Sequence, residues 1–288
     1  LLIMLLLPLG RAWAQTSFEE IDANPAKAGG VYLAYPVEEH LQTPAPKGYQ
    51  PFYISHYGRH GSRFLLGDSD YKWIIDLLKD AQTQHALTDL GRDLLAKLEE
   101  LWPVVEGRGG DLTSVGERQH RGIAHRMYAH YPEVFRKAKK VSARSTMSLR
   151  CAMSMAAFCD ELKGLSPGLD MHLEASEKYV RYLNWQSKAS NAFADGKHGP
   201  WVEEYRKFSL AQTRPERMCQ SLFSNSNYVL KKVNPSELMW GLYWIVVDMQ
   251  DIDTAIQLPQ VLTNRELFDL WQVINYKFYV DGANHADG

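Results

Sequence analysis

Hydrophobic residues recur every three or four positions through most of the chain, which predicts a largely helical protein. In residues 70–102 the spacing predicts two helices, and the second begins after Thr88, a side chain suited to capping a helix. Thr113 is suited to cap a third helix, and Thr263 with Glu266 has the spacing of a capping box. The expected helices cover residues 70–102 in two pieces, 113–131, 149–162 and most of 175–278.

Two short segments have the aromatic and β-branched composition of strands instead. Residues 51–57 form one and run directly into a glycine-flanked loop, and residues 140–143 form the other. Strands alternating with helices indicate an α/β fold with a mainly parallel sheet flanked by helices. We expect residues 15–165 to form this core, residues 166–278 to form an inserted helical cap, and residues 279–288 to begin a return to the core.

The N-terminal segment has the features of an export signal. Residues 1–9 are almost entirely apolar, and Ala12 and Ala14 have the small-residue spacing at which signal peptidase cleaves. We interpret residues 1–14 as part of a signal peptide, so the mature protein is expected in the periplasm or secreted. The remaining sequence has no apolar stretch long enough to predict a membrane span.

Composition narrows the range of functions. The 288 residues include 32 Lys and Arg against 34 Asp and Glu, a formal net charge of −2. This balance argues against a general nucleic-acid binder, which is usually basic overall. The three cysteines, Cys151, Cys159 and Cys219, are too few for a disulfide-rich scaffold.

The loop after residues 51–57 has a concentrated cationic motif, Arg59-His60-Gly61-x-Arg63. Two neighbouring guanidinium groups lower the pKa of an imidazole and keep it neutral, hence nucleophilic. They also present a fork of donors to the oxygens of a phosphoryl group. This combination favours attack on phosphorus and a covalent phosphohistidine.

Two further motifs follow in the same order as in one known family. They are Leu112-Thr113-x-x-Gly116-x-x-Gln119 and Arg144-Ser145-Thr146-x-x-x-Arg150-Cys151-x-x-Ser154-x-x-x-Phe158. With these motifs the chain resembles the histidine acid phosphatases, the phytase-like branch of the histidine phosphatase superfamily. Within that branch it is most similar to the bacterial multiple inositol polyphosphate phosphatases. The resemblance implies a phosphoglycerate-mutase-like fold and metal-independent hydrolysis of phosphomonoesters, inositol polyphosphates such as phytate among them.

The same resemblance implies a role for each matching residue. His60 is the residue that accepts the phosphoryl group, Arg59 and Arg63 bind its oxygens, and Arg150 is the third arginine of the pocket. Arg144 supports the site or reaches a second phosphate. Thr113, Gly116 and Gln119 are assigned packing and capping roles, and no cofactor or metal is implied. The expected partner is a phosphorylated small molecule.

The proton donor to the leaving alcohol is not identified in the sequence. Asn284-His285-Ala286-Asp287 is similar to the family's His-Ala-Glu motif, but we interpret it as a coincidental match and expect the donor beyond residue 288. The alternatives are a general acid or sugar phosphatase, and a catalytically inactive phosphate-binding fragment. His120, His125 and His130 are five residues apart, so they do not share a helix face as metal ligands would, and we expect packing or solvent roles.

Overall fold

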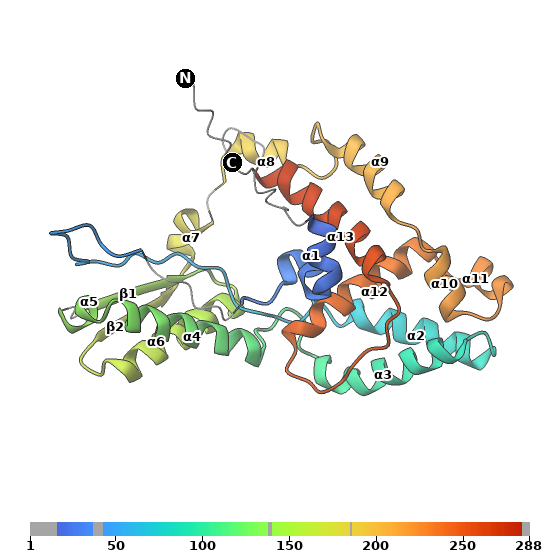
Figure 1. The fold of residues 1–288 in the computed structure, drawn as a ribbon, viewed down its shortest axis with the longest axis horizontal. Coiled ribbons are helices and arrows are strands. Elements are labelled where there is room, and N and C mark those ends of the chain that lie inside the picture. Colours follow the sequence, from blue (N-terminus) through green and yellow to red (C-terminus); the bar gives the residue numbers. More distant parts are fainter. Residues whose placement is uncertain (1–15, 37–42, 138–139, 185, 284–288) are drawn as a thin grey trace, which may run out of the picture.

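The computed structural model describes residues 16–36, 43–137, 140–184 and 186–283. Two packed groups of elements lie side by side along the longest axis of the molecule (Figure 1). One group contains the β-strands and the helices that cover them, and the other group is entirely helical in the described residues. The expected signal segment at residues 1–14 and the His285–Asp287 match lie outside the described residues.

Helices make up most of the described chain, and the strands lie near its middle. In chain order the elements are α1 (Ser17–Ala23), η1 (Pro25–Tyr32), α2 (Ser69–Thr83), α3 (Asp89–Val105), α4 (Ser114–His130), α5 (Pro132–Lys137), β1 (Lys140–Ser145), α6 (Leu149–Leu165), β2 (Asp170–Ala175), α7 (Glu177–Leu183), α8 (Lys188–Phe193), α9 (Val202–Gln212), α10 (Glu216–Leu222), α11 (Ser226–Lys232), α12 (Pro235–Asp248), η2 (Met249–Asp251), α13 (Asn264–Phe278) and η3 (Tyr279–Ala283).

The expected helix starts are confirmed. Thr88, Thr113 and Thr263 each accept a hydrogen bond from the backbone N–H three residues later, at the starts of α3, α4 and α13. Asn234 does the same for α12, whose first residue is Pro235. These caps satisfy N–H groups that the first turn of a helix otherwise leaves without a partner.

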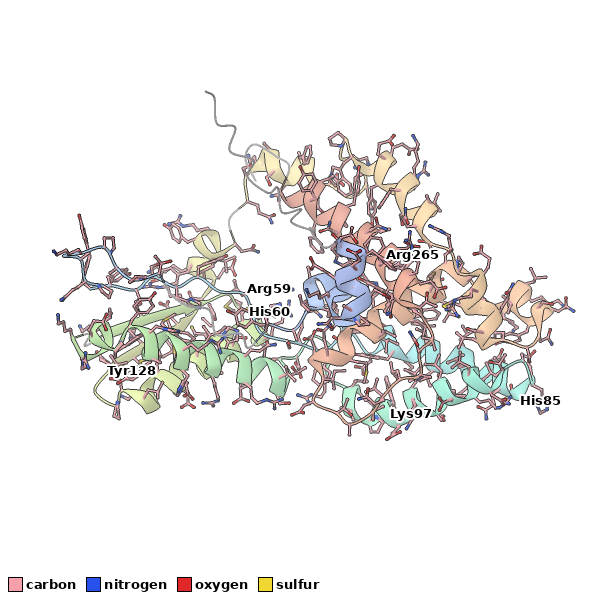
Figure 2. All side chains as sticks on the ribbon, in the orientation of Figure 1. Arg59, His60, His85, Lys97, Tyr128 and Arg265 are labelled. Atoms are coloured by element: carbon pink, nitrogen blue, oxygen red, sulfur yellow. The ribbon has the colours of Figure 1, made fainter. Side chains whose placement is uncertain are left out.

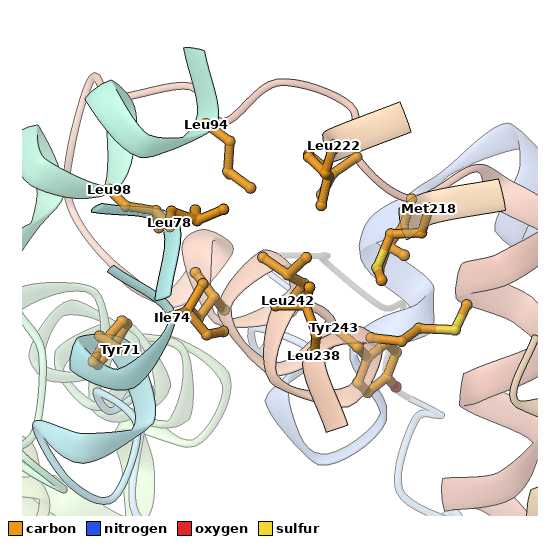
Figure 3. Packing of buried hydrophobic residues seen from close by; sticks show 14 of the residues in the cluster. Tyr71, Ile74, Leu78, Leu94, Leu98, Met218, Leu222, Leu238, Leu242 and Tyr243 are labelled. Atoms are coloured by element: carbon orange, nitrogen blue, oxygen red, sulfur yellow. The ribbon is translucent and has the colours of Figure 1, made fainter. Parts of the chain in front are cut away.

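The larger hydrophobic core lies in the helical group, where α2 and α3 pack with α10 and α12 (Figure 3). The side chains drawn from these helices are fully or almost fully buried, among them Leu78, Leu94, Leu222 and Leu242. Burial of each Leu side chain contributes roughly 1.5–3 kcal/mol to folding stability. This packing therefore stabilises helices whose outer faces are polar. The packing therefore joins α2 and α3, which precede residue 165, to α10 and α12, which follow it.

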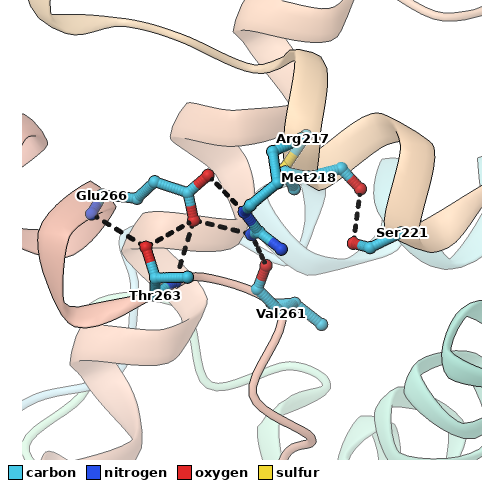
Figure 4. A network of polar contacts seen from close by, with 6 residues as sticks. All are labelled: Arg217, Met218, Ser221, Val261, Thr263 and Glu266. Carbon is cyan, nitrogen blue, oxygen red and sulfur yellow. Dashed lines mark hydrogen bonds and ion pairs between the residues drawn. The ribbon is translucent and has the colours of Figure 1, made fainter.

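A polar network holds α10 against the start of α13 (Figure 4). The Arg217 guanidinium donates to both carboxylate oxygens of Glu266, at 2.7 and 2.6 Å, and to the carbonyl of Val261. Glu266 also accepts from the backbone N–H of Thr263 and completes its capping box. The Glu266 carboxylate thus takes part in a helix cap and in a bidentate ion pair with Arg217. Bidentate pairs are stronger than pairs with a single hydrogen bond.

The second group is a small sheet with helices packed on it. Strands β1 and β2 pair in parallel with Lys140 opposite Asp170 and Ser145 opposite Ala175. Helices α4 and α6 pack closely together beside this sheet, and a separate core that includes Phe135 and Leu162 lies between them and the strands.

The fold is mixed and rich in helices, with a small parallel sheet, whereas the large parallel sheet that we expected is not seen in the described residues, where the sheet has two strands. Residues 51–57 form no strand and leave Phe52 and Tyr53 exposed. Aromatic and β-branched residues favour strands, but a strand also needs a neighbouring backbone with which it can pair. Strand β2 lies within the segment that we expected to be helical, so the sheet continues past residue 165.

Two further observations concern the membrane and the cysteines. No helix in the described ranges is long and apolar enough to cross a bilayer. Cys151, Cys159 and Cys219 are free thiols.

Candidate active site

Arg59 and His60 lie between the two groups of elements (Figure 2). They line a hollow of about 550 Å³, which we call the central cavity. Its walls come from η1, the extended chain before His60, α4 and η2, and include Tyr32, Gln119 and Asp251. The site is therefore built from segments that are far apart in the sequence.

The loop of residues 58–63 is pressed against the first turns of α4. A Cβ atom on Gly61 would lie 2.5 Å from the carbonyl oxygen of Gly116, and one on Gly116 would lie 2.3 Å from that of Ser62. Real Cβ atoms do not approach so closely, so both positions require glycine. The second sequence motif therefore has a structural role, because its glycine, Gly116, allows the loop to approach α4 closely.

Ser62, the variable residue of the first motif, is held on several sides. Its carbonyl accepts from the backbone N–H of Thr113 at 2.9 Å and from the Thr113 hydroxyl at 3.1 Å. Its N–H donates to Gln119 Oε1 at 2.9 Å, and its hydroxyl accepts from Gln119 Nε2 at 2.8 Å. The same hydroxyl donates to Asp251. The packing and capping roles expected of Thr113, Gly116 and Gln119 are confirmed.

Gly61 is also tied to α6. Its backbone N–H donates to the hydroxyl of Ser154 at 3.1 Å, and Ser154 is buried. Both the second and the third sequence motif therefore contact the 58–63 loop, which explains why three motifs separated along the chain belong to one site.

His60 is half-buried beside the arginines, with its Nδ1 at 2.8 Å from the carbonyl oxygen of Gly61. A carbonyl oxygen can only accept, so Nδ1 carries the ring proton and Nε2 keeps its lone pair. Burial, with the charges of Arg59, Arg150 and Arg63, lowers the pKa of His60 to about 4, against the Gly61 hydrogen bond, which raises it. The imidazole is therefore neutral near pH 7, as expected, although burial rather than the arginines is the largest cause.

Arg59 and Arg63 both line the central cavity. Arg59 donates to the carbonyl of Val31 at 3.0 Å, which anchors its guanidinium to η1. Arg63 donates to the carbonyl of Phe64 and to the hydroxyl of Tyr32, and it lies over the Tyr32 ring at 4.7 Å. These contacts orient two cations toward one space, which suits an anion with several oxygens.

The two other expected arginines are placed differently from this pair. Arg150 lies near enough to lower the pKa of His60, and its buried Nε has no hydrogen-bond partner in the described part of the chain. Arg144 lies over the ring of Tyr179 at 4.4 Å and lines a second hollow of about 460 Å³, which we call the side groove. The side groove runs along β1 and α6 and shares Arg59 and His60 with the central cavity.

Several residues that line the central cavity were not assigned to it from the sequence. Tyr32 comes from η1, Asp251 from η2, and His120 from α4. His120, for which we expected a packing or solvent role, is buried, lines both hollows and hydrogen-bonds the backbone of Arg59. Among the described residues, no group of three His, Cys, Asp or Glu side chains is arranged to hold a metal ion.

No protein-family model and no curated protein sequence matches the chain. Solved structures do match, and three of them are of the multiple inositol polyphosphate phosphatase of Bifidobacterium longum. Its complex with inositol hexasulfate aligns over 91% of this chain and 71% of that one, with a TM-score of 0.67 and 14% identity. The phosphate complex (TM-score 0.54, 14% identity, 83% of this chain, 64% of that one) and the apo form (0.55, 15%, 83%, 65%) also match. At such identity the likeness shows a related fold.

Proposed function

We propose that the chain is a metal-independent phosphomonoester hydrolase that acts through a phosphohistidine on His60, with inositol polyphosphates such as phytate as its substrates. The observation that carries the proposal is a neutral imidazole, with its lone pair on Nε2, beside Arg59 and Arg63 in one cavity. The fold shared with an inositol polyphosphate phosphatase supports the same assignment.

In the first step, Nε2 of His60 attacks the phosphorus atom in line with the ester oxygen. A P–N bond forms as the P–O bond to the alcohol breaks, and the alcohol oxygen takes one proton from solvent water, which regains it when water attacks phosphorus in the second step. Arg59 and Arg63 donate to the non-bridging oxygens, and Arg150 adds positive charge from farther back. In the second step a water oxygen attacks phosphorus, the P–N bond breaks, and phosphate and neutral His60 are restored.

A polyphosphate substrate is favoured by the cations outside the central cavity. Arg144 and Lys140 line the side groove, which shares His60 with the central cavity. A second phosphate on the same ring is attracted to this positive charge while the first lies at His60. A general acid or sugar phosphatase is the second candidate, since the aromatic Tyr32 and Tyr35 also line the central cavity and suit a less charged substrate. A phosphate-binding protein without catalysis is the third.

Rapid quenching in alkali, where the P–N bond of phosphohistidine is stable, of the protein mixed with ³²P-labelled phytate tests the mechanism. We expect label on His60 in the unaltered protein and none in His60→Ala, with both proteins folded by circular dichroism. Label on another residue, or turnover that survives in His60→Ala, contradicts the mechanism. Binding of phosphate without any label supports the third candidate. Comparing kcat/KM for phytate with that for an aryl phosphate separates the first candidate from the second.

Export to the periplasm or the medium belongs to the same proposal. It rests on residues 1–14 and is tested by expressing the gene in a Gram-negative host and locating the protein by cell fractionation. Protein that stays in the cytoplasm with residues 1–14 intact contradicts it.

A further inference from the structure

Asp251 is a buried carboxyl group that the proposed mechanism does not use. It lies in η2, at the end of α12, and its side chain is 3% exposed. It nevertheless lines the central cavity together with His60. A carboxylate repels an anion that is bound in the same cavity. The position of Asp251 therefore needs a structural explanation.

The contacts of Asp251 lead directly to the 58–63 loop. Its carboxylate accepts from the hydroxyl of Ser62, which in turn accepts from Gln119 Nε2 at 2.8 Å. The loop is thereby joined to η2 on one side and to α4 on the other. The two contacts hold Ser62, the residue directly before Arg63.

The charged and titratable groups near Asp251 come from several elements. Arg59 and Arg63 of the loop act on it electrostatically, and Asp248 lies one turn before it at the end of α12. His60 and His120 line the same cavity, and burial lowers the pKa of each imidazole. Tyr32 lines it from η1, and its pKa is raised.

We propose that Asp251 is a positioning residue that holds the 58–63 loop through Ser62 and acts as a counter-charge to Arg59 and Arg63, so that anions bind more weakly once it is ionised. This inference deepens the proposed function and rests on it. Burial raises the pKa of Asp251 to about 6, while the Ser62 hydrogen bond and the two arginines lower it. Below pH 6 the carboxyl is neutral and the arginines act unopposed. Above pH 6 the carboxylate offsets part of their charge.

Sulfate is a suitable probe because it stays a dianion from pH 5 to 7.5 and undergoes no turnover. We expect Asp251→Asn to bind sulfate about five-fold more tightly than the unaltered protein at pH 7.5, and equally at pH 5, by titration calorimetry. Asparagine keeps an oxygen that accepts from Ser62, so only the charge is lost. Asp253→Asn is the matched control, because Asp253 is exposed and pairs with Arg118, and we expect it to bind as the unaltered protein does.

A second variant tests the Ser62 contact should Asp251→Asn fail to fold. The Ser62 hydrogen bond lowers the pKa of Asp251, so Ser62→Ala moves the fall in sulfate affinity to higher pH. An unmoved midpoint overturns the inference, and so does an Asp251→Asn protein that binds sulfate no more tightly at pH 7.5. If these results accompany label on His60, only the role of Asp251 fails. An unaltered protein that binds no sulfate at pH 5 and takes no label overturns the proposed function as well.

Discussion

Gly61 and Gly116 lie backbone against backbone, with the 58–63 loop seated on the first turn of α4. A Cβ atom at Gly116 would come within 2.8 Å of the Ser62 nitrogen as well as 2.3 Å of its carbonyl oxygen. Thr113 and Gln119, three residues to either side, bond to the same serine. In the second motif, Thr113 and Gln119 thus lie about one helical turn before and after Gly116, the residue in close contact with the loop.

Gly116→Ala is expected to destabilise the protein by roughly 1–3 kcal/mol, because the loop must move away from α4 to admit the methyl group. It should also lower kcat/KM, since His60 moves with the loop. Gly164→Ala is the control, since a Cβ there meets nothing within 4 Å and an alanine in α6 leaves stability unchanged or raises it by about 1 kcal/mol. Urea unfolding and steady-state kinetics measure both effects. Equal stability of the two variants would contradict the close contact.

The rate of phosphohistidine formation is expected to rise as the pH rises through about 4. The pKa of His60 is lowered to about 4, and only the neutral imidazole has a lone pair on Nε2. Quench-flow measurement of labelled enzyme between pH 3 and 6 gives the profile. His125→Ala is the control, since His125 is exposed and contacts Glu161, and its profile should match that of the unaltered protein. A midpoint near pH 6.5 would mean that His60 is not shielded from water in this way.

Asp248→Asn is expected to gain stability relative to the unaltered protein as the pH rises. Asp248 is fully buried, and burial raises the pKa of its carboxyl to about 7 from an ordinary 3.8. Between these values the folded state binds more protons than the unfolded state, so the stability of the unaltered protein falls with rising pH. Asparagine keeps an acceptor for Tyr71, whose hydroxyl lies 2.6 Å from the carboxylate, and it does not ionise.

The difference in unfolding free energy between Asp248→Asn and the unaltered protein should therefore grow by roughly 2–4 kcal/mol from pH 4 to pH 8. Chemical unfolding at several pH values measures it. Asp253→Asn serves again as the control, because Asp253 is exposed and its pKa is lowered, so its difference should not grow over this range. A difference for Asp248→Asn that does not vary with pH would show that Asp248 is already ionised in the folded protein at pH 4.

The neutral imidazole of His60 and most of the helices could be predicted from the sequence because their causes are partly or wholly local. A cap such as that of Thr113 joins groups three residues apart, and helical periodicity repeats within one turn. Arg59, Gly61 and Arg63 likewise affect His60 from within a segment of five residues. The neutral state of His60 followed from its neighbours, although the larger effect of burial did not.

The rest was decided by the tertiary structure, because it depends on which distant segments meet. Ser62 and Asp251 are 189 residues apart, and no spacing in the sequence marks them as partners. Residues 51–57 have the composition of a strand yet form none, since pairing depends on a neighbouring backbone and not on the segment itself. The sequence left either a packing or a solvent role open for His120, and only the packing of α4 against the loop decides that it is buried beside Arg59.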